Sequence, residues 1–199
     1  MWGAIIAAVI VIGLVLWVIM IYNRLVELFN RAKNAFAQID VQLKRRYDLI
    51  PNLIEVAKKY MAHEEQTLLK VVEARNTAKS TLESVNEQGL DTQNLAQLGK
   101  AEQALGGALK GLNITIESYP DLKANQNMIQ LSEELSSTEN KIAFARQAYN
   151  DGATSFNIYK QSFPNNIIAG LFERFSKDIG MLEFEESKEV LNQAPKVQF

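Results

Sequence analysis

The sequence predicts an all-α protein: an N-terminal transmembrane helix that continues into an antiparallel up-down-up-down bundle of four long helices, followed by a short C-terminal helix and tail. Residues 2–22 carry no charged side chain, and apolar residues then recur at spacings of three and four along four segments. No stretch shows the strict apolar-polar alternation of strands. We expect a transmembrane helix at residues 2–22, a helical bundle domain at residues 23–163, and a short amphipathic helix with a tail at residues 164–199.

The first segment has the length of a membrane span. As a helix, its roughly 20 residues would cross about 30 Å of hydrocarbon. No Arg or Lys precedes it, no small-residue cleavage site follows it, and neither Pro nor Gly interrupts residues 14–50. We expect an uncleaved single-pass anchor in the lipid bilayer, because the remaining polar helices could not surround a buried core helix of this kind.

Basic residues follow the anchor and none precedes it. Arg24, Arg31 and Lys33 lie in the window that governs orientation. Positive charge favours the cytoplasmic side of a membrane. We therefore expect the N-terminus outside the cell and the bundle domain in the cytoplasm.

Composition argues against several classes of function. A net charge of −2 and a pI near 5.6 predict no partnership with nucleic acid, which requires a clustered basic surface. The chain has no Cys, and His63 is the single His, without the second His that a helical zinc site places four residues on. No Gly-x-Ser-x-Gly elbow is present. We expect no catalytic residue, metal or cofactor.

The first soluble segment carries one regular apolar stripe. Its members are Tyr22, Leu25, Phe29, Ala32, Phe36, Ile39 and Leu43. Asp48 can cap a new helix, and Pro51 is tolerated in a first helical turn. We therefore expect the chain to turn at residues 47–50 and a second helix at residues 49–87.

The basic triplet Lys44, Arg45 and Arg46 precedes this expected turn. One interpretation is a site for anionic lipid. About twenty helical residues would separate it from the headgroups, however, and that distance of roughly 30 Å is several times the Debye length of about 8 Å. We favour a basic turn that completes a helix C-terminus.

The third and fourth segments are bounded by prolines. Pro120 follows an apolar stripe over residues 95–119, and Pro164 follows one over residues 128–163. The third segment contains four glycines, which indicate a close neighbouring helix or a break near residues 106–107; they are Gly99, Gly106, Gly107 and Gly111. A polar row follows the fourth segment, either solvated or in a layer between subunits; it consists of Glu139, Arg146, Asn150 and Asn157.

A short apolar face follows Pro164, and the bundle, lipid or a neighbouring subunit could cover it. Its residues are Ile167, Ile168, Leu171, Phe172 and Phe175. The second and fourth helices would each run about 55 Å, against about 37 Å for the soluble part of the first helix. Such a mismatch would bring this face to the membrane surface. We predict a homo-oligomer in which these residues are the candidate partner or oligomer contacts, helped by Ala4 and Ala8 in the anchor.

The sequence closely resembles the LemA family of bacterial membrane proteins. The motifs that carry this resemblance are Asn34-Ala35-Phe36, residues 38–46, residues 48–53, His63-Glu64, residues 119–125, Glu133-Glu134-Leu135, Thr138-Glu139-Asn140, Tyr149-Asn150-Asp151, Phe163-Pro164 and the ending at residues 195–199. The resemblance implies one N-terminal helix in the bacterial inner membrane, a helical domain and a poorly defined biochemical role. Some relatives are encoded near membrane zinc metalloproteases or in magnetosome gene clusters.

Three functional hypotheses follow. The first is a non-catalytic membrane-anchored scaffold or adaptor that oligomerises and recruits other membrane proteins, for which a membrane zinc metalloprotease is a candidate. The second is a membrane-tethered sensor with a small ligand in the bundle. The third is an enzyme, which would need a catalytic pair built from Ser, Lys and carboxylates alone. The first hypothesis needs only an anchor and exposed helix faces, and we favour it.

Overall fold

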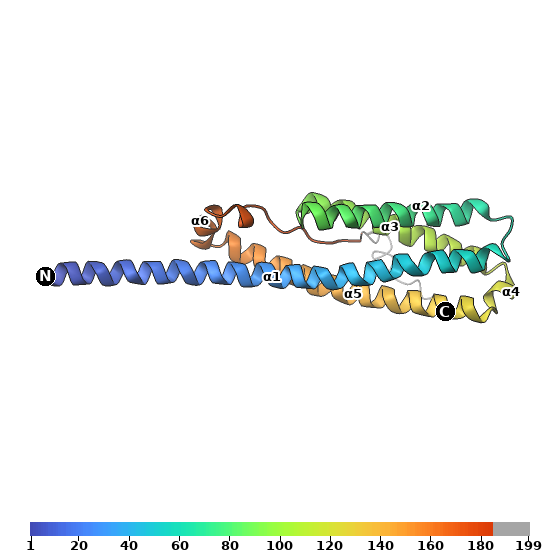
Figure 1. Ribbon diagram of the computed structural model, residues 1–199, viewed down its shortest axis with the longest axis horizontal. Helices are drawn as coiled ribbons and strands as arrows, with labels where there is room; N and C mark the ends of the chain where they lie inside the picture. The colour runs from blue at the N-terminus through green and yellow to red at the C-terminus, as the bar shows by residue number, and fades with distance from the viewer. Residues whose placement is uncertain (185–199) are drawn as a thin grey trace, which may run out of the picture.

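The computed structural model describes residues 1–184, and this part of the chain is helical almost throughout, without a strand (Figure 1). The elements are α1 (Trp2–Lys58), α2 (Glu65–Gln88), α3 (Thr92–Ile116), α4 (Pro120–Lys123), α5 (Gln126–Gln161), α6 (Asn165–Gly170) and the 3-10 helix η1 (Glu173–Phe175). The four long helices α1, α2, α3 and α5 alternate in direction. The predicted all-α class and the up-down-up-down arrangement are confirmed.

Two helix pairs build the bundle. Helices α1 and α5 lie antiparallel along most of their length, and the α2–α3 hairpin covers one side of this pair (Figure 1). The rings of Phe36 and Tyr149 meet edge to face between α1 and α5, with centroids 5.5 Å apart. One helical turn along, Gly152 packs against Ala32, and a Cβ atom there would be in ordinary van der Waals contact with the Ala32 Cα at 3.4 Å. The apolar stripes predicted for both helices form this seam.

Helix α1 does not end where the sequence predicted. It passes through the expected turn at residues 47–50, contains Pro51 in its interior and ends at Lys58, so the expected second helix at residues 49–87 is also wrong. A proline inside a helix leaves the carbonyl four residues earlier without its usual donor. Here that carbonyl belongs to Tyr47, and Arg75 Nε from α2 donates to it at 3.0 Å. A tertiary hydrogen bond therefore replaces the one that Pro51 removes.

The longer α1 also removes the predicted mismatch of helix lengths. Beyond Tyr22, α1 runs to Lys58 and equals the 36 residues of α5, so both are about 54 Å long. The splayed bundle expected from unequal lengths is not present. Helices α2 and α3 are shorter, with 24 and 25 residues. They leave the end of the α1–α5 pair near Tyr22 uncovered, and α6 and η1 pack there (Figure 1).

Short polar residues begin the later helices. The Asp91 side chain accepts a hydrogen bond from the Asn94 N–H (2.9 Å) at the start of α3, and the Asn125 side chain accepts from the Met128 N–H (3.2 Å) at the start of α5. Pro120 occupies the first turn of the short helix α4, where the missing N–H costs nothing. These caps explain the sharp corners between α2, α3, α4 and α5.

Candidate functional site

The apolar start of α1 projects from the rest of the molecule. In the described part of the chain, α1 is the one helix long and apolar enough to cross a membrane. Every side chain of residues 1–20 is exposed, and burial begins at Ile21. A core helix of a soluble protein would be covered by its neighbours, whereas this segment has no protein around it (Figure 1).

The apolar face after Pro164 divides into an inner and an outer part. Phe175 is fully buried, with ring centroids 5.8 Å from Tyr22 and 5.9 Å from Phe29. Phe172 packs on Tyr22 at 4.7 Å, and Ile168 is half-buried. These inner residues attach α6 and η1 to α1. The apolar spacing of the sequence does not distinguish these inner residues from the outer ones.

The outer part consists of Ile167 and Leu171, which are 56% and 73% exposed. Phe163 precedes them in the sequence and is 81% exposed, although the predicted set did not include it. That these residues contact a partner or a second copy of the chain remains a prediction. We call Phe163, Ile167 and Leu171 the outer apolar patch.

The basic triplet lies inside α1, well before its end at Lys58, so the predicted basic turn at a helix end is wrong. Each of its members pairs with a carboxylate: Lys44 with Asp40 at 2.7 Å, Arg45 with Glu134 at 3.7 Å, and Arg46 with Glu102 at 3.0 Å and Glu139 at 3.1 Å. Lys44 and Arg45 are exposed, but Arg46 points into the bundle. The triplet is therefore divided between surface pairs and a buried pair.

The buried pair belongs to a small polar cluster in the core. Arg46 Nη1 donates to Glu102 Oε2, and the Tyr47 hydroxyl donates to the other oxygen of the same carboxylate. Burial raises the pKa of Glu102, and the Arg46 charge opposes this rise. Burial, followed by the charge of Glu102, raises the pKa of Tyr47. The cluster is closed to solvent, and its chemistry is that of a structural tie between α1 and α3.

The segment after η1 is held by two asparagines of α5 that lie seven residues apart. Asn157 Nδ2 donates to the Ile179 carbonyl at 2.8 Å, while its Oδ1 accepts from the Ile179 N–H at 3.0 Å. Asn150 makes the same pair of bonds to Leu182, at 3.1 and 2.9 Å. Sequence reasoning expected this polar row to face solvent or another subunit. Instead, each of these two side-chain amides forms hydrogen bonds with the N–H and the carbonyl of one residue in the extended segment. In a sheet, a neighbouring strand would provide these bonds.

Glycines allow the same segment to lie close to α3. A Cβ atom on Gly99 would be 2.3 Å from the Glu183 carbonyl oxygen, and one on Gly180 would be 2.7 Å from the Asp91 carbonyl oxygen. The sequence predicted a close neighbouring helix or a break near residues 106–107 for the glycine-rich third segment. Helix α3 is unbroken there, and the close neighbour is the extended segment at Gly99 rather than a helix. We call residues 176–184 the C-terminal strap. The remainder of the predicted tail lies outside the described residues.

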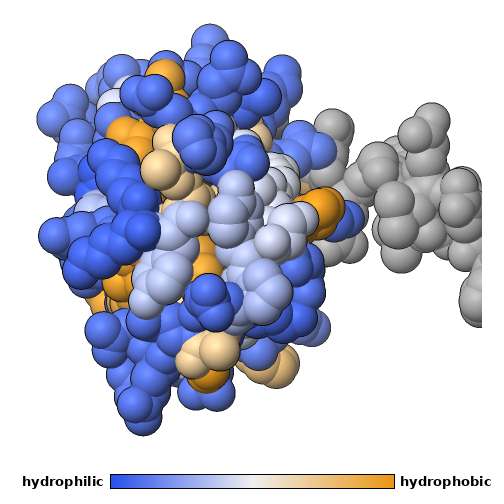
Figure 2. All heavy atoms as spheres, turned by 90° about the vertical axis from the view of Figure 1, so that its right-hand side faces the viewer, coloured by the Kyte–Doolittle hydropathy of each residue, from blue (hydrophilic) through white to orange (hydrophobic). Residues whose placement is uncertain are grey.

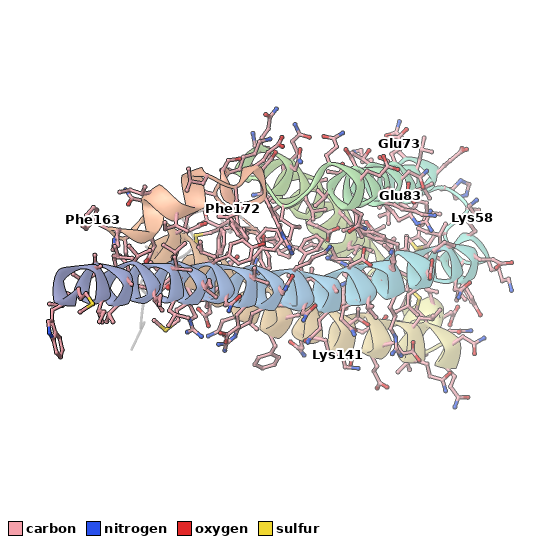
Figure 3. All side chains as sticks on the ribbon, turned by 60° about the vertical axis from the view of Figure 1, so that its left-hand side comes forward. Lys58, Glu73, Glu83, Lys141, Phe163 and Phe172 are labelled. Atoms are coloured by element: carbon pink, nitrogen blue, oxygen red, sulfur yellow. The ribbon has the colours of Figure 1, made fainter. Side chains whose placement is uncertain are left out.

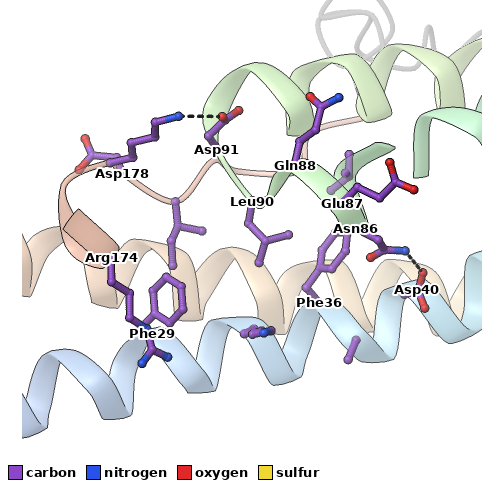
Figure 4. A pocket seen from close by; sticks show the side chains of 16 residues that line it. Phe29, Phe36, Asp40, Asn86, Glu87, Gln88, Leu90, Asp91, Arg174 and Asp178 are labelled. Atoms are coloured by element: carbon purple, nitrogen blue, oxygen red, sulfur yellow. Dashed lines mark hydrogen bonds and ion pairs between the residues drawn. The ribbon is translucent and has the colours of Figure 1, made fainter. Parts of the chain in front are cut away.

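An open groove lies where the α2–α3 corner, η1 and α1 meet (Figure 4). Its volume is about 410 Å³. Its walls carry acidic and basic side chains. Lys177 pairs with Asp91 at 3.6 Å, and Asp40 accepts a hydrogen bond from Asn86 Nδ2 at 2.8 Å. The guanidinium of Arg174 lies over the Phe29 ring, 4.8 Å from its centroid. This groove is a candidate cavity for the sensor hypothesis.

A second groove runs along the side of the α1–α5 pair that the α2–α3 hairpin does not cover. It has a volume of about 620 Å³, and its lining residues are Ala37, Gln38, Val41, Gln42, Lys141, Phe144, Ala145 and Ala148. Val41 is 59% and Phe144 is 74% exposed. The buried Oε1 atom of Gln42 accepts no hydrogen bond from any residue that the structure describes. We call this feature the outer groove.

Residues suited to catalysis do not gather in the described part of the chain. His63 is exposed in the turn between α1 and α2, and its neighbour Glu64 accepts a hydrogen bond from the Tyr119 hydroxyl at 3.2 Å. Among residues 1–184 no group of three or more His, Asp or Glu side chains could hold a metal ion. The features on which a function can be argued thus include the exposed apolar helix, the two grooves described above and the outer apolar patch.

The fold and these surfaces define a class: helical-bundle proteins whose first helix is long and apolar enough to span a membrane and continues without a break into the bundle. Residues 35–199 match the model of the LemA family, so the chain belongs to the LemA family. The resemblance noted from the motifs is confirmed.

Named relatives support this assignment. The chain is 31% identical over 147 residues to Protein LemA of Metamycoplasma hominis, a match that covers 74% of this chain and 63% of that protein. It is 26% identical over 174 residues to Magnetosome protein MamQ 2 of Paramagnetospirillum magneticum, covering 80% of this chain and 64% of that protein. The chain thus spans somewhat less than two thirds of the length of these relatives. Neither name denotes an enzyme.

Proposed function

We propose that this protein is a non-catalytic, membrane-anchored scaffold that self-associates and recruits another membrane protein, for which a membrane zinc metalloprotease is a candidate. One observation carries the proposal. Helix α1 is a single helix of 57 residues whose first part is fully exposed and whose later part supplies a large share of the bundle core. Because no linker separates the two parts, the bundle is held at a defined angle to its anchor, as a scaffold requires.

The outer groove is the surface we propose for protein contact. It is lined by small residues that let a helix approach closely, and it is bordered by the exposed side chains of Val41 and Phe144. A partner helix in the groove would cover both side chains. A donor on that helix would also satisfy the Gln42 Oε1 atom, whose burial without a partner is unfavourable.

Site-specific photocrosslinking in intact membranes tests this proposal. A photoreactive amino acid in place of Phe144 should yield crosslinks to a second copy of the chain and to another membrane protein, identified by mass spectrometry. The matched control is the same substitution at Ile114, which is 65% exposed on α3 and lies away from the outer groove. Equal crosslinking at both positions, or none at Phe144, would contradict the proposed contact surface.

We further propose that the anchor lies in the bacterial inner membrane with the N-terminus outside and the bundle in the cytoplasm. The charges of Arg24, Arg31 and Lys33 support this orientation. Because the chain lacks Cys, a single cysteine at the exposed Ala62 can report the side of the bundle. A membrane-impermeant thiol reagent should label it only after the cells are opened. Labelling in intact cells would reverse the orientation.

The groove beside Phe29 and Arg174 favours a second candidate function, a membrane-tethered sensor for a small polar ligand. Its volume of about 410 Å³ suits such a ligand, and Lys33, Arg174 and Asp178 offer groups of both charges. A ligand that raises the melting temperature of the full chain in detergent, but not that of an Arg174→Ala variant, would support this function.

A further inference from the structure

We propose that the outer apolar patch inserts into the interfacial region of the lipid bilayer, so that the protein contacts the membrane through a second, in-plane anchor beside α1. This inference rests on the proposed membrane anchoring of α1. It assigns lipid, rather than a second copy of the chain, as the partner of Phe163, Ile167 and Leu171.

The position of α6 along α1 is the first argument. Tyr22 is the last residue of the uncharged run that begins at Trp2, so it marks the level at which α1 would leave the hydrocarbon. The Phe172 ring lies 4.7 Å from the Tyr22 ring. The short helix α6 directly precedes Phe172 and packs against both α1 and α5. The patch is therefore held at the level of the membrane surface.

The distribution of apolar side chains is the second argument. At the Tyr22 end, Phe163 points away from the bundle in Figure 3, and it is 81% exposed. The opposite end of the bundle presents mainly hydrophilic side chains (Figure 2). Leu69 (52%) and Ile129 (44%) are exposed toward that opposite end, but less than Phe163 and Leu171. A concentration of strongly exposed apolar side chains at one end is expected when that end faces an apolar phase.

The charge pattern is the third argument. No Asp or Glu occurs at residues 152–172, and residues 161–172 carry no charge at all. The basic residues Lys160 and Arg174 lie at the two ends of this stretch, and one exposed acidic residue, Glu173, follows it directly. Acidic groups would be repelled by the negative surface of a bacterial membrane, whereas basic groups are attracted to it. The stretch therefore has the composition of an interfacial segment.

The size of the patch favours lipid over a protein partner. Three side chains fall far short of the roughly 800 Å² that each partner buries in a typical stable protein interface. The predicted mismatch of helix lengths, which favoured self-association through this face, is also absent. The bilayer that receives α1 is already adjacent and needs no further partner.

Fluorescent labels at single cysteines test the inference, and the full chain without native Cys is suited to them. Ile167→Cys and Leu171→Cys variants would be labelled with an environment-sensitive fluorophore and reconstituted into vesicles of phosphatidylcholine and phosphatidylglycerol. Ile114→Cys is the exposed control far from the patch, and Val11→Cys reports the span itself. We expect lipid-borne nitroxide to quench the labels at 167 and 171 several times more strongly than the label at 114, and aqueous iodide to quench them several times less.

Each alternative result is distinguishable. Labels at 167 and 171 that are as accessible to iodide as the label at 114 would overturn the inference, while strong lipid quenching at 11 would leave the anchoring intact. Labels protected from both quenchers would overturn it in favour of a protein contact at this face. Iodide quenching at 11 as strong as at 114 would overturn the proposed anchoring together with the inference.

Discussion

The guanidinium of Arg46 lies 3.0 Å from Glu102 Oε2 inside the bundle, and it joins the bundle part of α1 to the middle of α3. Only 6% of the Arg46 side chain and none of the Glu102 side chain is exposed. A buried ion pair contributes little over an apolar replacement, but the loss of one partner leaves an isolated buried charge. We therefore expect the pair to favour one alignment of α3 with α1.

Replacing Glu102 by Ala should destabilise the protein by up to about 3–5 kcal/mol, because the Arg46 charge would then keep only the half-exposed Glu139 as a partner. Denaturation by guanidinium in detergent, followed by circular dichroism, measures this loss. Arg45→Ala is the control, since its pair with Glu134 is half exposed and should contribute about 0–1 kcal/mol. Similar losses in the two variants would contradict the assigned role of the pair.

Pro51 and Arg75 should be energetically coupled through the Tyr47 carbonyl. Arg75→Ala removes the only hydrogen bond described to this oxygen from outside α1 and should cost about 1–3 kcal/mol. In a Pro51→Ala background the new N–H can donate to the same oxygen, so the cost of Arg75→Ala should fall. A double-mutant cycle of unfolding free energies measures the difference. Strictly additive effects would mean that Arg75 does not compensate for the proline.

Alkaline pH should weaken the fold through two buried phenols. Burial raises the pKa of both Tyr47 and Tyr149. Phenols in the unfolded chain ionise near pH 10, so above that pH the unfolded state loses protons that the folded state keeps. Each such tyrosine lowers the free energy of unfolding by up to about 1.4 kcal/mol per pH unit.

Tyr149→Phe tests this dependence, because it removes one of the two ionisable groups. The slope of unfolding free energy against pH above 10 should become shallower by up to about 1.4 kcal/mol per pH unit. The variant also loses the hydrogen bond from the Tyr149 hydroxyl to the Gly180 carbonyl (2.7 Å), which lowers its stability at every pH. Each protein's free energy of unfolding is therefore compared with its own value at neutral pH. Identical slopes in the two proteins would contradict the prediction.

The C-terminal strap should depend on the two asparagines that hold it. An Asn150→Ala, Asn157→Ala double variant loses four hydrogen bonds to the strap backbone. Trypsin should then cleave after the exposed Lys177 much faster than in the wild-type protein. Asn140→Ala, at an exposed position on the same helix, should leave the rate unchanged. An unchanged rate in the double variant would show that the strap is held by other contacts.

Much of the fold was predictable because its signals are local. Five members of the predicted stripe on α1 are buried, namely Leu25, Ala32, Phe36, Ile39 and Leu43, whereas Tyr22 and Phe29 are half-buried. Helix α5 follows its predicted extent within two residues. The site was less predictable. Of the five apolar residues after Pro164, Phe175 is core and Leu171 is surface, although both read as equally apolar in the sequence. The roles of Asn150 and Asn157 depend on backbone that lies more than twenty residues further along the chain.

The sequence by itself determined the uncharged first helix, the apolar registers of the bundle and the LemA family, because charge content and periodicity are properties of neighbouring residues. Only the tertiary structure decided that α1 continues past Pro51, because the missing donor to the Tyr47 carbonyl is replaced by Arg75, which lies 28 residues after Tyr47 in the chain. It also decided that Arg46 is buried while Lys44 and Arg45 are exposed. Both outcomes depend on which side chain from a distant part of the sequence packs against α1. The local spacing of residues carries no information about such contacts.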